Sequence, residues 1–136
     1  MSDRERALRF FLRAVGTVMG LALIALFMPR AWMAWCHEQI GLGAFPDAPI
    51  AEYLARGTSG LCALVGGLFW LMSRRPAEHR TLIRYVAVGM AALAVILGTY
   101  AVRMGIPASW ALGDSAGALA TAIVVLVLQG RRRDEA

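Results

Sequence analysis

The sequence predicts an all-α integral membrane protein, a four-helix bundle with both termini in the cytoplasm. Hydrophobic residues make up 59% of the 136-residue chain, and they gather in four long uninterrupted blocks. With its flanking turns, each block approaches the ~20 residues that a helix needs to cross a bilayer. Because a backbone in lipid has to satisfy its own hydrogen bonds, such blocks form helices. We expect a single domain over residues 1–136, with spans at about 8–28, 53–73, 82–103 and 107–129.

The basic residues indicate how the chain is threaded. All fourteen are arginine, and only Arg30, Arg56 and Arg103 fall on the expected outer side. Arginine-rich segments stay in the cytoplasm, which predicts a multi-pass protein of the bacterial inner membrane. The net charge of +5 then reflects topology and contact with anionic membrane lipids, and excludes a nucleic-acid partner. The remaining arginines share the cytoplasmic side: Arg4, Arg6, Arg9, Arg13, Arg74, Arg75, Arg80, Arg84, Arg131, Arg132 and Arg133.

The first span follows a charged start and ends at Pro29. A cleaved signal peptide is the alternative, but "MPRAWMAWC" lacks the small residues that such cleavage requires. The next segment, "RAWMAWCHEQIGLG", is too polar to span a membrane. We expect it to form a short interfacial helix in the first outer loop, with Trp32 and Trp35 as anchors. The alternative is a lid over a pocket.

The second span begins at Pro49 and presents polar or small residues on one face. Small residues let membrane helices approach closely, so this face is predicted to pack against neighbours with Arg56 pointing into the bundle. The first and fourth spans carry similar faces, at Gly16-x-x-x-Gly20 and Gly113-x-x-x-Gly117. Helical spacing gives the face of the second span as Glu52, Arg56, Ser59 or Gly60, Ala63 and Gly67.

The third span ends at Arg103, and Pro107 opens the fourth. Because the loops on both sides of the third span are short, the second, third and fourth spans are predicted to be antiparallel neighbours. The fourth span carries Asp114. An acid in a span costs ~2.5–3.5 kcal/mol on insertion scales, and normally faces the interior with a partner.

The polar residues near the outer ends of the spans form the candidate site. One interpretation is structural: an Arg56–Asp114 bridge joins the second and fourth spans, and Glu52 pairs with Arg56 at i,i+4. Another is a site that binds a polar lipid headgroup or a small solute. A third is that these side chains extend to the membrane surface without a partner. The candidates are Glu52, Tyr53, Arg56, Tyr100, Arg103, Asp114 and Ser115.

No catalytic set, metal site or cofactor is predicted. His37 and His79 lie on opposite sides of the membrane in the expected topology, so they cannot share a haem or a metal ion. Cys36 and Cys62 have neither C-x-x-C nor metal-site spacing. Two buried thiols are the favoured interpretation, although a disulfide is possible in an oxidising compartment.

The arrangement of arginines resembles that of small bacterial four-helix proteins of the DoxX-like group. The matching features are the Arg56 segment "EYLARGTSGLCALVGG", the Arg103 segment "GTYAVR" and an acid in the fourth span. The resemblance implies an association with respiratory or redox membrane complexes. Only Arg56 and Arg103 match the pattern of that group.

Three functions follow as hypotheses. Small size and several glycine faces favour an accessory or assembly subunit of a membrane complex, or a homo-oligomer. The polar cluster favours a small transporter or a lipid- or solute-binding protein. The third hypothesis is a membrane oxidoreductase component that uses the two cysteines, or a quinone held near Trp32 and Tyr100.

Overall fold

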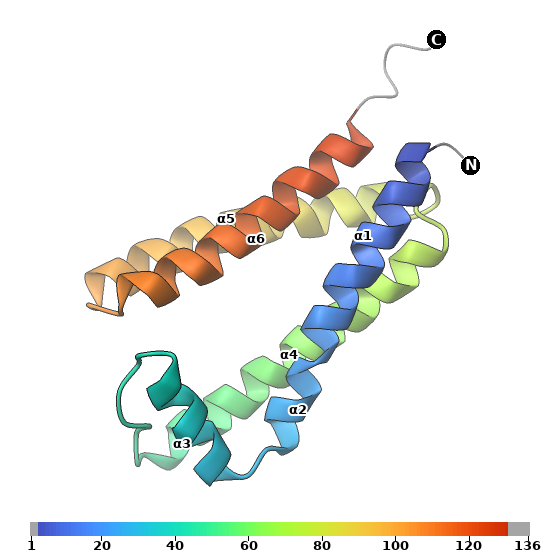
Figure 1. Ribbon diagram of the computed structural model, residues 1–136. Helices are drawn as coiled ribbons and strands as arrows, with labels where there is room; N and C mark the ends of the chain where they lie inside the picture. Colours follow the sequence, from blue (N-terminus) through green and yellow to red (C-terminus); the bar gives the residue numbers. More distant parts are fainter. Residues whose placement is uncertain (1–2, 131–136) are drawn as a thin grey trace.

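The computed structural model describes residues 3–130, and all regular structure within them is helical (Figure 1). α1 and α2 are separated only by Leu21 and form one span, Asp3–Phe27. Four helical units are long and apolar enough to cross a membrane, as predicted, and they indicate a multi-pass membrane protein. The C-terminal arginines 131–133 lie outside the described residues. The helices are α1 (Asp3–Gly20), α2 (Ala22–Phe27), α3 (Arg30–Gln39), α4 (Pro49–Arg74), α5 (Arg80–Arg103) and α6 (Ala108–Gln129).

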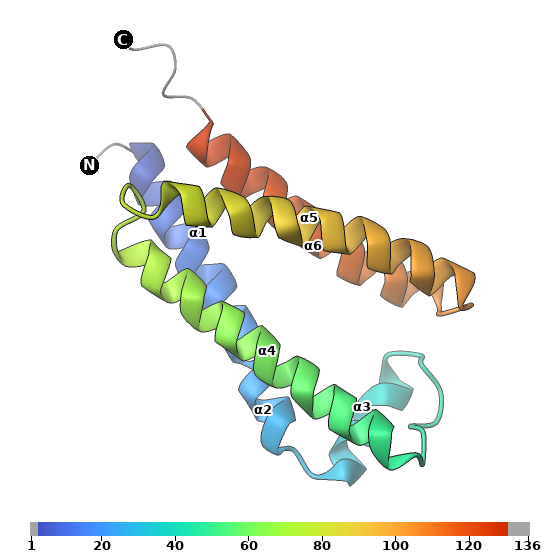
Figure 2. The ribbon, with the colours of Figure 1, turned by 180° about the vertical axis from the view of Figure 1, so that it is seen from behind.

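The spans pair into two helical hairpins. α1 and α2 pack along α4, and α5 packs along α6. The hairpins converge where α1 begins and α6 ends, which we call the closed end, and they diverge toward α3, which we call the open end (Figures 1 and 2). The expected packing of the second span along the third is therefore wrong: α4 and α5 approach each other only near the turn that joins them. Short loops fix the direction of neighbouring helices but not their crossing angle.

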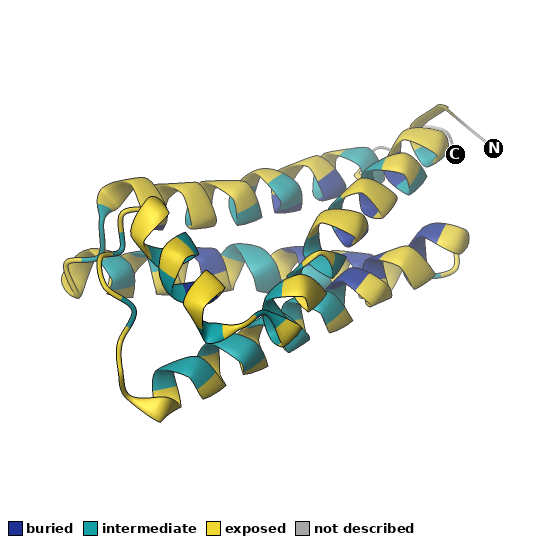
Figure 3. Cartoon of the chain, turned by 60° about the horizontal axis from the view of Figure 1, so that its bottom comes forward, coloured by how far each residue is buried: buried dark blue, intermediate teal, exposed yellow. Residues whose placement is uncertain are grey.

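The hydrophobic core lies at the closed end. It joins all four spans, and α1 contributes a contact with α6 as well as with α4. In Figure 3 the buried residues concentrate toward this end, while exposed residues dominate the rest of the helical surface. Much of the apolar surface is thus left for lipid or for other proteins. The core residues are Leu8, Leu12, Phe69, Met72, Ile83, Ala87, Ala122 and Val125.

Glycines set the close contact between α1 and α4. A Cβ atom added to Gly16 would lie 2.7 Å from the carbonyl oxygen of Gly66, and one added to Gly66 would lie 2.7 Å from that of Gly16. The prediction of close packing at Gly16 is confirmed, but the packing glycine of α4 is Gly66 and not Gly67. Each residue turns a helix by about 100°, so an error of one position selects a different face.

The predicted packing face of the fourth span, Gly113 and Gly117, does not pack against any other part of the described chain. Gly113 and Gly117 have no neighbouring atom within 4 Å of an added Cβ. The close contact between α5 and α6 instead involves Gly98, where an added Cβ would lie 2.6 Å from the hydroxyl oxygen of Ser115. The Gly113–Gly117 face therefore remains open.

Candidate functional site

The seven candidate residues divide between the two hairpins. Glu52, Tyr53 and Arg56 lie in the first turns of α4, whereas Tyr100, Arg103, Asp114 and Ser115 lie on α5 and α6. Because the hairpins diverge toward this end, the predicted Arg56–Asp114 bridge is absent among residues 3–130.

Arg56 is turned toward the end of the first span. Its Nη1 donates to the carbonyl oxygen of Leu26 at 2.6 Å, and its Nη2 donates to that of Met28 at 2.9 Å. Its Nε and Nη2 also reach Oε1 of Glu52, at 3.0 and 2.7 Å. The predicted i,i+4 pair of Glu52 and Arg56 is confirmed, as is the inward direction of Arg56.

The sequence explains why these carbonyls need a donor. α2 ends at Phe27, and Met28 is extended (φ −64°, ψ 138°) as expected of a residue before proline. The last carbonyls of a helix have no donor within that helix, and Pro29 has no N–H to offer. Arg56 supplies the missing donors from the neighbouring span. Its role in the structure is to cap the end of α2.

Two further charges extend this pair into a row of alternating sign. Arg30, the first residue of α3, places Nη1 3.4 Å from Oε2 of Glu52. Its Nη2 lies 3.1 Å from Oδ1 of Asp47 and 3.1 Å from the carbonyl oxygen of Pro46. We call Asp47, Arg30, Glu52 and Arg56 the charge row. Arg30 and Asp47 were not among the residues predicted from the sequence, although Arg30 directly follows Pro29 and Asp47 lies two residues before Pro49, where α4 begins.

The charge row ties α3 and its loop to α4. The Arg30 guanidinium lies 5.4 Å from the ring centroid of Phe45, which also makes an edge-to-face contact with His37 at 5.4 Å. Trp32 and Trp35 are 64% and 62% exposed. Both indoles are thus free to contact a membrane surface, and their role as interfacial anchors stays a prediction.

The cysteines and histidines do not form a site in the described part of the chain. Cys36 in α3 and Cys62 in α4 are half-buried free thiols. The Nδ1 atom of His37 is 2.8 Å from the carbonyl oxygen of Gly43. Among residues 3–130, no three His, Cys, Asp or Glu side chains gather closely enough to hold a metal ion.

The second group lines a pocket of about 500 Å³ between α5 and α6, near the open end. The polar residues of its lining are Asp114, Ser115 and Tyr100, and Trp110 also lines it. Trp110 was not among the residues predicted from the sequence. Tyr53 and Arg103 are exposed and lie outside this pocket.

Asp114 differs from every acid of the charge row in having no ionic partner within residues 3–130. It is the seventh residue of α6, about 9 Å along the helix axis from Ala108. An acid at this depth in a membrane helix normally faces a partner or water. Asp114 is therefore the candidate functional residue, and Arg56 is a structural one.

No known protein family, no curated protein and no solved structure matches this chain. The resemblance to the DoxX-like group thus stays a prediction from the sequence.

Proposed function

We propose that the chain is an accessory or assembly subunit of a bacterial inner-membrane complex, or a homo-oligomer, which packs through α6. The distribution of arginines supports a topology with the closed end and both termini in the cytoplasm. In that topology α3 lies on the outer membrane surface.

The observation that carries the proposal is the unpaired Asp114 in a membrane-spanning helix. Lipid cannot stabilise a carboxylate, so a partner that offers a hydrogen-bond donor or a positive charge gains affinity there. The chain pairs Glu52, the acid in the first turn of α4, with two arginines. Because Asp114 has no such ionic partner among residues 3–130, we infer that its partner comes from outside the chain.

The surface next to Asp114 suits another helix. Gly113 and Gly117 stand one turn apart on α6, and open space surrounds both. Small residues at i and i+4 allow a neighbouring helix to approach closely, as in the small-xxx-small contacts of membrane proteins. Such a contact would bring the neighbouring backbone and side chains beside Asp114.

In-cell photo-crosslinking tests this proposal. A photoreactive amino acid replaces Ala120, which shares the Gly113 side of α6. We expect one discrete crosslinked product, whose mass identifies a second copy or another membrane protein. The substitutions Asp114→Asn and Gly117→Leu should each reduce its yield severalfold.

Two controls make the result specific. The same photoreactive residue at Leu61, which is 65% exposed on α4, should give no such product. Gly89→Leu on α5 adds the same bulk at a glycine that also has open space around it, and should leave the yield unchanged. Equal crosslinking from Ala120 and Leu61, or a product that tolerates Asp114→Asn and Gly117→Leu, would contradict the proposal.

The pocket supports a second candidate function, the binding of a quaternary ammonium group from a small solute or a lipid headgroup. A carboxylate beside Tyr100 and Trp110 combines an opposite charge with two aromatic rings, which together recognise organic cations. Choline titrated onto the purified protein should change the fluorescence of Trp110. The response should disappear in Asp114→Asn and persist in Arg103→Gln; an equal response in both variants argues against the binding function.

A further inference from the structure

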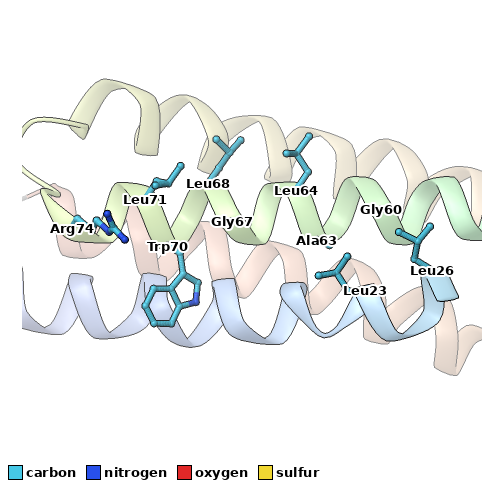
Figure 4. A pocket seen from close by; sticks show the side chains of 10 residues that line it. All are labelled: Leu23, Leu26, Gly60, Ala63, Leu64, Gly67, Leu68, Trp70, Leu71 and Arg74. Carbon is cyan, nitrogen blue, oxygen red and sulfur yellow. The ribbon is translucent and has the colours of Figure 1, made fainter. Parts of the chain in front are cut away.

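A second cavity runs along α4 on a different part of the molecule. It has a volume of about 610 Å³, and α2 and α4 alone line it within the described chain. Figure 4 shows Leu23, Leu26 and Gly60 at one end and Arg74 at the other, with Gly67 midway. We call this cavity the α2–α4 groove. It shares no lining residue with the Asp114 pocket.

The groove exists because α4 carries glycines along this face. Gly67 has no atom within 4 Å of an added Cβ, and Gly60 has only the methyl groups of Leu26 at 3.9 Å. Side chains such as Leu64 and Leu68 form its walls. The result is an apolar channel that is open to the side along much of its length.

The length of the groove fits a hydrocarbon chain. From Gly60 to Arg74 the helix rises about 21 Å. One leaflet of a bilayer core is about 15 Å deep, so the groove is long enough for a whole acyl chain.

The charge at one end of the groove fits an anionic headgroup. Arg74 is the last residue of α4 and lies at the closed end, where the spans carry most of their arginines. Arg13 is close by: its guanidinium lies 5.4 Å from the ring centroid of Trp70, which lines the groove, and its Nε is 3.4 Å from Ser73 Oγ. Neither Arg74 nor Arg13 forms an ion pair with a carboxylate of residues 3–130.

We propose that the α2–α4 groove binds one acyl chain of an anionic phospholipid, with the lipid phosphate held by Arg74 beside Arg13. An apolar groove that ends at two guanidinium groups without a carboxylate partner among residues 3–130 is complementary to such a lipid in both polarity and charge. The site is independent of the proposed assembly through α6.

Fluorescence quenching by brominated lipids tests this site through Trp70. The full-length protein carries Trp32→Phe, Trp35→Phe and Trp110→Phe, which leaves Trp70 as its only tryptophan. It is reconstituted in vesicles that contain either phosphatidylglycerol or phosphatidylcholine with brominated acyl chains. We expect phosphatidylglycerol to compete for the groove about fivefold better, the factor expected for one arginine near an anionic headgroup.

Two matched pairs of variants separate the headgroup from the chain. Arg74→Gln should bring the preference for phosphatidylglycerol close to one, whereas Arg84→Gln on α5 should keep it. Gly67→Leu fills the groove and should weaken quenching by both lipids, whereas Gly89→Leu should not. Circular dichroism and monodisperse elution establish that each variant is folded before its quenching is compared.

Three outcomes would overturn the proposal. The first is equal quenching by the two lipids in the parent protein. The second is a preference that survives Arg74→Gln in a folded variant. The third is protection of Trp70 from both lipids together with dissociation of an oligomer by Gly67→Leu, which would identify a protein helix as the occupant.

Discussion

Both hairpins of this protein carry charged residues toward the open end, but the two hairpins differ in how these residues are paired. In the α1–α4 hairpin, Glu52 and Arg56 contact each other, and Arg56 also caps the carbonyls at the end of α2. In the α5–α6 hairpin, Asp114 faces a pocket and has no ionic partner among residues 3–130. The contrast distinguishes a charge that stabilises the fold from one that is available to a partner or ligand.

The largest effect is expected from breaking the backbone contact of the first hairpin. Leucine at Gly66 would place its Cβ 2.7 Å from the Gly16 carbonyl oxygen, and backbone cannot yield as a side chain can. We expect a loss of about 3 kcal/mol or more in the free energy of unfolding in detergent. Gly67→Leu, one residue along, should change it by less than about 0.5 kcal/mol. Similar losses from both variants would show that the helix face has been assigned wrongly.

Removal of the α2 cap should have the next largest effect. Arg56→Leu leaves two carbonyls without their donor and Glu52 without its main partner, so we expect destabilisation by about 2–4 kcal/mol. Arg56→Lys should recover only part of it, because an ammonium group cannot reproduce the fork of a guanidinium. Denaturation in mild detergent measures both. Arg103→Gln is the matched control at an exposed arginine, and it should behave like the parent protein.

Double-mutant cycles sharpen the comparison between hairpins. The coupling energy between Glu52 and Arg56 should be about 1–3 kcal/mol, as for residues in one hydrogen-bonded network. The coupling between Arg56 and Asp114 should be below about 0.5 kcal/mol, because the two side chains belong to separate groups. A strong coupling between Arg56 and Asp114 would contradict this expectation and would indicate that the bridge predicted from the sequence does form.

The smallest effect should come from Asp114→Asn in the isolated monomer. Without a partner the carboxylate contributes nothing to the fold, and its removal lowers the cost of keeping α6 in an apolar environment. We expect a gain of about 0.5–1 kcal/mol in the free energy of unfolding, measured where the protein is monomeric. Marked destabilisation would mean that Asp114 has a structural partner within the chain.

The sequence was sufficient for features that depend on local spacing. Apolar blocks predicted the four spans, and the i,i+4 spacing predicted the pair of Glu52 and Arg56. It was insufficient where two spans have to be placed relative to each other. The Arg56–Asp114 bridge required α4 and α6 to be neighbours at the open end, which loop length does not determine.

The remaining errors have a similar origin. The contact of Arg56 with Leu26 and Met28 depends on where α2 ends beside α4, and this follows from tertiary packing. Whether Gly66 or Gly67 faces α1 depends on the rotation of α4 about its axis. Both positions are glycine, so the sequence alone does not distinguish them. Arg30 could have been recognised as a partner, since it directly follows Pro29 and the start of α3 brings it near Glu52.

The cap that Arg56 places on α2 also bears on biosynthesis. α4 carries Glu52 and Arg56 into the membrane, yet the carbonyls that Arg56 contacts belong to the span made before it. If α4 were inserted alone, the guanidinium group of Arg56 would lack some of its acceptors, and the last carbonyl groups of the first span would lack their donor. The first two spans should therefore leave the translocon as a pair, before the α5–α6 hairpin is synthesised.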